Sequence, residues 1–445
     1  MSRQIIRSLR DGLILRRSTV EDTEALIAFH SDVHRDPGAE GPEEYVAAWV
    51  RDLMERLHPS FGVDDFTIVE DTRTGAIVSS MCLISQTWSY DGVQFGVGRP
   101  ELVGTHADYR RRGLVRNQFD VIHQWSAKRG EMLQAITGIP YFYRQFGYEM
   151  GLTLGGSRAG YKRQVPKLEE GQEEACRLRP VSESDLPFIA ELYAHGNRRY
   201  PVACVRDETL WRYELFGKSE KNVNRWAVSL IETSEGEPMG YLAHSTHLRL
   251  RQGRVWVRAY ELKQGVSWLA VTPSVVRCLW ALGEEWAAQD AEQEMETFSF
   301  SLGVEHPAYD VFHGRLPHTS PPYAWFVRVP DLQRFLLHIA PALDQRLAGS
   351  PLVGHRGEVQ ISFYRHGLRL VIDAGRVVRV EPWQPTPEQG GDAAFPDLTF
   401  LQLLFGYRSL DELDHAFADC WASSNARAVL QSLFPKRPSN VWPVS

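Results

Sequence analysis

The residues best suited to chemistry form a short basic run, Arg110-Arg111-Arg112-Gly113. The residues before it, Val97 to Thr105, are predicted to form a strand. After it, apolar residues from Val115 to Trp125 recur at the spacing of an amphipathic helix that ends at Gly130. A helix N-terminus offers unpaired N–H groups and a positive dipole end, and a glycine lets an anion approach the backbone. The order strand, loop, helix therefore predicts a pyrophosphate site, whereas the run alone would indicate a solvated basic turn.

A second candidate is the aromatic segment Tyr141-Phe142-Tyr143-Arg144-Gln145-Phe146-Gly147-Tyr148, which follows a predicted strand at Met132 to Ile136. Such segments more often fill a core. However, Tyr143 lies four residues before Gly147, and its segment follows the strand next to the arginine loop. A phenol with a pKa of about 10 can protonate a departing thiolate, whose thiol has a pKa of about 8.5. We therefore predict Tyr143 as a general acid.

Two similar units are expected to hold these residues in place. The first begins with a strand at Leu13 to Leu15 and a helix start with capping-box spacing at Thr19 and Asp22. Strands at Phe66 to Val69 and Ala76 to Val78 follow. The spacing of Leu15-Arg16, Asp22, Leu26 and Phe29 returns 163 residues later, and the matching residues are Leu178-Arg179, Asp185, Ile189 and Leu192. Duplication explains this repeat, with chance similarity of strand and helix starts as the alternative.

The second unit is expected to lack a cofactor site. Its predicted strand, Trp268 to Val271, continues into Thr272-Pro273-Ser274-Val275-Val276-Arg277 without an arginine–glycine loop or a glycine for close backbone approach. An acidic stretch, Lys167 to Glu174, is the predicted linker between the units. The last third of the chain has three short predicted strands between Val359 and Val380, flanked by helical stretches. This pattern predicts an α+β domain of roughly 115 residues, an ordinary domain size.

The strand, the R-x-x-G loop and the Y-x-x-x-G-Y segment resemble motifs of the GNAT acetyltransferase superfamily. Arg110 and Gly113 match the first arginine and glycine of its R-x-x-G-x-G/A signature, while Val115 replaces the second small residue. More closely, the runs Arg-Arg-Arg-Gly-Leu-Val-Arg and Tyr-Arg-Gln-Phe-Gly-Tyr resemble the enhanced-intracellular-survival (Eis) type. That resemblance implies an α/β (α+β) fold with a catalytic GNAT domain at 1–160, a degenerate GNAT domain at 175–328 and a sterol-carrier-protein-like domain at 329–445.

The same resemblance implies residue roles. The strand residues Val103, Gly104 and Thr105 would pair with the pantetheine arm and polarise the thioester. The remaining cofactor-binding residues implied are Arg110, Arg111, Arg112, Gly113, Leu114, Val115, Arg116, Gly138 and Ile139. Tyr143 would be the general acid. In the Eis type the terminal carboxylate enters the active site, which makes Ser445 a candidate catalytic residue, with a frayed chain end as the alternative.

Composition limits the other possibilities. The net charge of −7 argues against nucleic acid as the main partner, and no apolar run is long enough to span a membrane. Five scattered cysteines and the absence of an HExxH spacing argue against a metal site and fit a cytoplasmic protein. We expect an acetyl-CoA-dependent N-acetyltransferase with acetyl-CoA as cosubstrate, no metal, a small-molecule amine as acceptor and a homo-oligomeric state. The alternatives are a CoA-binding pseudoenzyme and an apolar-ligand-binding protein acting through its C-terminal domain.

Overall fold

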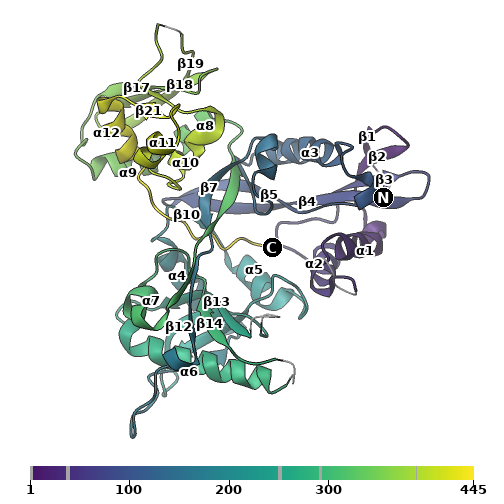
Figure 1. Cartoon of the computed structure of the whole chain (residues 1–445), viewed down its shortest axis with the longest axis vertical. Coiled ribbons are helices and arrows are strands. Elements are labelled where there is room, and N and C mark those ends of the chain that lie inside the picture. The colour runs from purple at the N-terminus through teal and green to yellow at the C-terminus, as the bar shows by residue number, and fades with distance from the viewer. Residues whose placement is uncertain (1–3, 37–40, 249–252, 290–292, 387) are drawn as a thin grey trace.

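The computed structural model describes residues 4–36, 41–248, 253–289, 293–386 and 388–445. It contains three sheets with helices packed on them, and the chain has the mixed α/β fold that the sequence predicts (Figure 1). The third sheet and its helices lie at one end of the first sheet, and the second sheet lies across from it. The last residues of the chain run between the first two sheets (Figure 1).

The first sheet has nine strands in the order β1-β2-β3-β4-β5-β6-β16-β7, and β10 pairs with β4. Its strands are β1 Ile5–Ser8, β2 Leu13–Arg17, β3 Phe66–Asp71, β4 Ala76–Tyr90, β5 Val93–Thr105, β6 Leu133–Ile136, β7 Glu149–Leu154, β10 Val202–Cys204 and β16 Tyr323–Arg328. Helices α1 (Thr23–Val33) and α2 (Glu44–Glu55) cover one face, and α3 (Leu114–Lys128) covers the other (Figure 1).

The second sheet has seven strands in the order β15-β8-β14-β13-β12-β11-β9. Its strands are β8 Ser157–Tyr161, β9 Arg177–Pro180, β11 Ala227–Glu232, β12 Pro238–His244, β13 Arg254–Leu262, β14 Thr297–Phe300 and β15 His318–Ser320. The helices of this unit are α4 Leu186–Asn197, α5 Glu208–Arg212, α6 Trp268–Ala287 and α7 Pro307–Val311.

The third sheet has the order β19-β18-β17-β20-β21. Its strands are β17 Gly357–Ser362, β18 Gly367–Asp373, β19 Arg376–Trp383, β20 Ala393–Ala394 and β21 Trp421–Ala422. The accompanying helices are α8 Leu332–His338, α9 Ala340–Ala348, α10 Phe400–Leu404, α11 Leu410–Ala416 and α12 Ser424–Leu433. One continuous core joins this unit to the first sheet, as the Phe95 and Phe335 rings show at 5.2 Å.

The repeat seen in the sequence has a structural counterpart. Arg16 binds Asp22 and Glu70 in the first unit, and Arg179 binds Asp185 and Glu232 in the second. Both aspartates also complete a capping box at the start of the first helix of their unit. The same strand therefore meets the same helix start through the same ion pair in both units, which supports duplication over chance.

The two units exchange strands. Tyr323–Arg328 was expected in the second unit, but β16 pairs with β6 and β7 of the first sheet. Conversely, most of Ser157–Tyr161 was expected in the first unit, but β8 pairs with β14 and β15 of the second sheet. The expected boundaries at 160 and 328 therefore do not coincide with the edges of the sheets. Both segments read as ordinary strands, and only long-range pairing decides which sheet receives them.

The expected strand at Trp268 to Val271 is wrong, because these residues form the first turn of α6. The strand before the loop ends at Leu262, and Gly265 then turns the chain with φ +88°. The Ser267 hydroxyl caps the helix by accepting a hydrogen bond from the Ala270 N–H. The expectation that no glycine opens the backbone here is also wrong, since Gly265 lies in that loop.

Candidate functional site

A notch opens in the first sheet where β5 and β6 diverge. Between the pairs Ser80–Gly104 and Cys82–Glu101, β5 carries one extra residue, Leu102, with φ +53°. This bulge bends β5. The described parallel pairing between β5 and β6 involves Val97 and Gly98, upstream of the bulge. Beyond the bulge, no pairing between β5 and β6 is found among the described residues, and Val103 to Thr105 line a cavity.

The notch leaves backbone groups of β5 available to a ligand. The His106 N–H donates to the Val78 carbonyl oxygen at 2.9 Å. Hydrogen-bonded and non-hydrogen-bonded pairs alternate along an antiparallel ladder, so the next pair, Ser79 and Thr105, is a non-hydrogen-bonded one. The N–H of Thr105 therefore points away from β4 and into the notch. An extended molecule with amide groups could therefore pair with this edge of β5.

A cavity of about 760 Å³ occupies the notch and brings together most of the predicted residues. The predicted residues in its lining are Val103, Gly104, Thr105, Arg110, Arg111, Gly113, Leu114, Val115, Arg116, Ile139 and Tyr143. Two of the predicted cofactor-binding residues lie outside this lining. The Arg112 guanidinium stacks on the Tyr109 ring, and Gly138 packs behind Tyr143, whose hydroxyl would lie 3.2 Å from a Cβ at that position.

The arginine loop ends at the N-terminus of α3. Gly113 has φ +72°, and the first helical hydrogen bond runs from the Asn117 N–H to the Gly113 carbonyl oxygen at 3.1 Å. The N–H groups from Gly113 to Arg116 therefore have no partner within the helix and converge at the cavity. Within the described part of the chain, the exposed Arg111 side chain has no salt-bridge partner. This end of the cavity suits an anion such as a pyrophosphate.

Helix α1 forms the wall opposite the loop. A Cβ at Gly104 would lie 2.9 Å from Val33 Cγ1 and 3.4 Å from His34 Cε1. Glycine at this position therefore lets the end of α1 rest directly on β5, which places Val33 and His34 in the cavity lining. His34 is not among the predicted site residues, because nothing in the local sequence shows that the end of α1 meets Gly104 of β5.

Tyr143 lies in the short helical turn Phe142–Phe146 and is only 5% exposed. Burial, together with the charge of Glu101, raises the pKa of its hydroxyl well above the ordinary value. The assumption of an unperturbed phenol is therefore wrong, and the group stays protonated at neutral pH. Among the described residues its hydroxyl has no hydrogen-bond partner, so it is free to donate to a ligand atom in the cavity.

Glu101 is a second residue that the sequence did not single out. Its carboxylate lies 2.5 Å from the Arg99 guanidinium, directly before the bulge. Burial raises the pKa of Glu101, and Arg99 only partly opposes this effect. Nothing in the local sequence distinguishes this carboxylate from a strand residue facing solvent, because its burial depends on segments far away in the chain.

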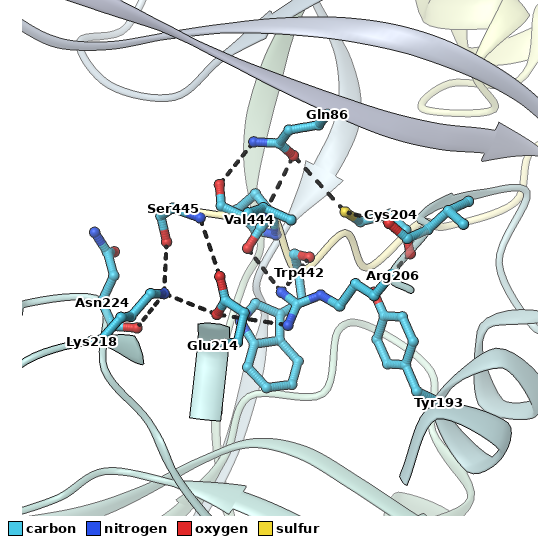
Figure 2. A network of polar contacts seen from close by, with 12 residues as sticks. Gln86, Tyr193, Cys204, Arg206, Glu214, Lys218, Asn224, Trp442, Val444 and Ser445 are labelled. Atoms are coloured by element: carbon cyan, nitrogen blue, oxygen red, sulfur yellow. Dashed lines mark hydrogen bonds and ion pairs between the residues drawn. The ribbon is translucent and has the colours of Figure 1, made fainter. Parts of the chain in front are cut away.

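The C-terminal residues Val441 to Ser445 run between the first two sheets, and all of them except Pro443 are buried (Figure 2). Arginine and glutamine side chains hold the backbone carbonyls: Arg258 donates to Val441 at 2.9 Å, Arg206 to Pro443 at 2.9 Å, and both Arg99 and Gln86 to Val444 at 2.8 Å. The alternative of a frayed end is therefore excluded for this segment.

Ser445 itself turns toward the second unit (Figure 2). Its N–H donates to Glu214 Oε1 at 3.3 Å, and its hydroxyl lies 3.5 Å from Lys218 Nζ. Trp442 anchors the segment under Arg206, whose guanidinium lies 4.2 Å from the indole centroid. Ser445 is not among the residues that line the cavity in the notch.

The corresponding notch of the second unit is filled. There β13 and β14 are parallel, and the Tyr260, Trp268 and His306 rings pack together beyond their last pair, at 4.8 to 6.3 Å between centroids. The loop before α6 carries Lys263 in place of an arginine run. The second unit thus keeps the strand geometry but has side chains where the first has a cavity.

Two further classes of site were sought. Within the described residues, no group of three or more histidine, cysteine, aspartate or glutamate side chains is placed to hold a metal ion. Over the same residues, no helix combines the length and the apolar character needed to cross a membrane.

Comparisons with known proteins agree with this geometry. Residues 15–151 match the model of a GNAT acetyltransferase domain. No curated protein sequence matches the chain. A solved structure from Enterococcus faecalis V583, described as a probable N-acyltransferase, has a TM-score of 0.68 at 13% identity, covering 97% of this chain and 100% of its own. A GCN5-related N-acetyltransferase from Kribbella flavida has a TM-score of 0.62 at 16% identity, covering 97% of this chain and 100% of its own. Eis1 from Mycobacterium abscessus has a TM-score of 0.58 at 13% identity, covering 96% of this chain and 99% of its own. The chain therefore shares its fold with these proteins over nearly its whole length, and the part that matches the GNAT acetyltransferase domain model includes the notch.

Proposed function

We propose that this protein transfers an acetyl group from acetyl-CoA directly to a primary amine. The observation that carries the proposal is the cavity in the notch. It has free helical N–H groups and arginines at one end, the unpaired edge of β5 along its side, and the Tyr143 hydroxyl in its lining. These features match, in order, a pyrophosphate, an amide-containing arm and a thioester sulfur.

In the proposed reaction the amine nitrogen attacks the thioester carbonyl carbon, and backbone N–H groups of β5 stabilise the oxyanion. The C–S bond then breaks, and Tyr143 donates its proton to the sulfur. A strongly raised pKa suits this role, because the phenol is fully protonated before the sulfur leaves. Acetyl-CoA rather than a longer acyl-CoA is the proposed donor, because Tyr143, Phe326 and Ile136 pack closely beneath the notch.

Ser445 is proposed to act on the acceptor side, where its carboxylate would attract a cationic amine. Ser445 lies in a buried group of charges that includes Arg206, Lys218 and Glu214 (Figure 2). Arg99, which pairs with Glu101, holds the carbonyl of the neighbouring Val444. Aminoglycosides, polyamines and lysine side chains are acceptors of this chemical class. Removal of Ser445 should raise KM for the amine while leaving the affinity for CoA unchanged.

The test is thiol release from acetyl-CoA by the purified full-length chain, with a thiol-reactive dye and a panel of polyamines and aminoglycosides. We expect release that depends on the amine and acetylated product in the mass spectrum. CoA binding without release under any amine would identify a pseudoenzyme. Absence of CoA binding by calorimetry would contradict the assignment of the notch itself.

A second candidate function rests on a separate cavity of about 610 Å³ beside the third sheet. Apolar side chains such as Phe363, Leu368, Trp383 and Leu401 line it, next to His366 and Gln384. This lining would fit an apolar ligand with a polar end, in keeping with the proposed sterol-carrier-like character of this unit. Organic extraction of the purified protein followed by mass spectrometry should recover such a ligand, and repeated recovery of protein without lipid would exclude it.

A further inference from the structure

His34 is held at the wall of the notch by packing that leaves it little freedom. It caps the C-terminal end of α1, and its ring rests on β5 because Gly104 has no side chain. The cavity lining contains both His34 and Tyr143. His34 therefore shares with the proposed acid the space that a thioester would occupy.

The hydrogen bonds of His34 determine which ring nitrogen can accept a proton. Its Nδ1 lies 3.1 Å from the His30 carbonyl oxygen. A carbonyl can only accept, so Nδ1 carries the hydrogen and Nε2 retains its lone pair. Among the described residues Nε2 has no hydrogen-bond partner. A fixed tautomer with a free Nε2 is the arrangement that a general base requires.

His34 and Tyr143 act from opposite faces of the first sheet. Neighbouring residues of β4 identify these faces: Ser80 contacts His30 of α1 at 3.2 Å, and Ser79 contacts Gln118 of α3 at 2.7 Å. Tyr143 packs against Phe119 on the α3 side, whereas His34 extends α1. Figure 1 shows the C-terminal segment on the α1 side. An amine approaching from that side would meet His34 before the thioester, and the sulfur would leave toward Tyr143.

The surroundings keep His34 neutral. Burial lowers its pKa, and the hydrogen bond to His30 only partly opposes this. His30, on the same helix, is itself buried with a pKa far below the ordinary value because of its burial. Residues 103–105 of β5 contribute no titratable side chain. The remaining charged or titratable groups in the cavity lining come from the loop, α3 and the turn after β6, and they are Tyr109, Arg110, Arg111, Arg116 and Tyr143.

We propose that His34 Nε2 is the general base that takes the proton from the attacking amine, which deepens the function proposed above and rests on it. The bound ammonium first releases one proton to solvent, which frees the nitrogen lone pair. As the N–C bond forms, a second proton passes from the nitrogen to Nε2. As the C–S bond breaks, one proton passes from Tyr143 to the sulfur. The imidazolium and the tyrosinate then exchange the proton through solvent, and CoA leaves as the thiol. Ser445 contributes to amine binding in this scheme, since its contacts are with Glu214 and Lys218.

The test compares His34→Gln and His34→Ala with His195→Gln, a control at an exposed histidine at the end of α4. We expect kcat to fall about 100-fold in both His34 variants, with CoA affinity within twofold of wild type. Wild-type kcat should fall as the pH drops through a value below 6.5, because His34 must be neutral, and this acidic limb should be absent in the variants. Added imidazole should restore part of the activity of His34→Ala.

Each outcome has a distinct meaning. Suppose that the wild type releases thiol but that kcat of His34→Gln stays within threefold of the wild-type value, or that this variant still loses activity at acidic pH. The base is then another group, and the transferase function stands. If the wild type never releases thiol, the transferase function falls and this inference falls with it. A readout independent of turnover is the ¹⁵N spectrum of His34 in the protein with CoA bound. It should show the Nδ1–H tautomer, and an Nε2–H tautomer would overturn the proposal.

Discussion

The notch of the first unit and the notch of the second unit have the same strand geometry but opposite contents. In the first, β5 and β6 separate around a cavity of about 760 Å³, bounded by Gly113 and three arginines. In the second, Tyr260, Trp268 and His306 fill the corresponding space. Both loops contain a glycine with positive φ, Gly113 directly before α3 and Gly265 three residues before α6. The difference shows that the fold supplies the opening and the helix N-terminus, while side chains decide whether a ligand enters.

The largest expected effect is on cofactor binding when a carboxylate is placed at the loop. Gly113→Glu forces a side chain into a left-handed conformation and sets a negative charge against the pyrophosphate. We expect CoA affinity in calorimetry to fall by about 1000-fold or more, about 4 kcal/mol. The matched control is Gly265→Glu in the second unit, at φ +88° and equally open space. A comparable loss in the control would mean that the second notch also binds CoA.

The second effect concerns the ion pairs shared by the two units. Arg16 is 2% exposed, and its counterpart Arg179 is 38% exposed. Removing a buried partner leaves uncompensated charges, so Arg16→Met should lower the free energy of unfolding by about 3 kcal/mol, against about 1 kcal/mol or less for Arg179→Met. Urea denaturation followed by tryptophan fluorescence measures both. Equal losses would show that the two salt bridges contribute alike despite their different burial.

The same pair predicts a pH dependence. Arg16 lowers the pKa of Asp22 in the folded protein, even though burial alone would raise it. The carboxylate therefore stabilises the fold above its unfolded pKa of about 4, and this contribution is lost as the pH falls through the lower folded value. Urea denaturation measures the free energy of unfolding at pH 3 and at pH 7. The difference between these two free energies should be smaller in Arg16→Met than in wild type.

The third effect is on chemistry. Tyr143→Phe removes the proposed proton donor without changing the packing of the ring, so kcat should fall about 100-fold while the Kd for CoA is unchanged. In the second unit, Tyr260→Phe removes only a hydroxyl that contacts Thr272 at 3.1 Å and should leave kcat at the wild-type value. Thiol release at saturating amine distinguishes them. Full activity in Tyr143→Phe would disprove its role as the acid.

The smallest expected effect concerns charge at the loop. Arg111 is exposed and lines the cavity, so Arg111→Gln should weaken CoA binding about tenfold through loss of one charge-assisted contact. The loss should shrink as salt is raised. Lys263→Gln, in the corresponding loop of the second unit, is the control and should leave the affinity unchanged. A salt-independent loss in Arg111→Gln would indicate damage to the loop rather than a missing charge.

Local features of this chain could be predicted from the sequence, and distant pairings could not. The strand before the arginine loop, the helix after it and the capping box at Thr19 depend on neighbouring residues, and the structure contains all three. The exchange of β8 and β16 between the sheets depends on partners more than a hundred residues away. The first turn of α6 could not be told from a strand, because Trp268 to Val271 is a short apolar run that fits both the helical and the strand periodicity.

The candidate site divides in the same way. Arg110 to Gly113 and Tyr143 could be predicted as candidates from residue type and spacing, because their signal lies in neighbouring residues. His34 was missed, since it reaches the cavity only through the contact of α1 with Gly104. The path of the C-terminal segment was equally hidden, because its backbone is held by Gln86, Arg99, Arg206 and Arg258, which are scattered along the chain.

The strand exchange has a consequence for how the protein is made and divided. The first sheet is complete only when β16 lies between β6 and β7, so residues as late as Arg328 must leave the ribosome before the proposed catalytic unit can close. A fragment cut near residue 160 would expose the edges of β6 and β7 and remove β8 from its own sheet. Neither unit can therefore be cut out at the expected boundaries without losing a strand of its own sheet.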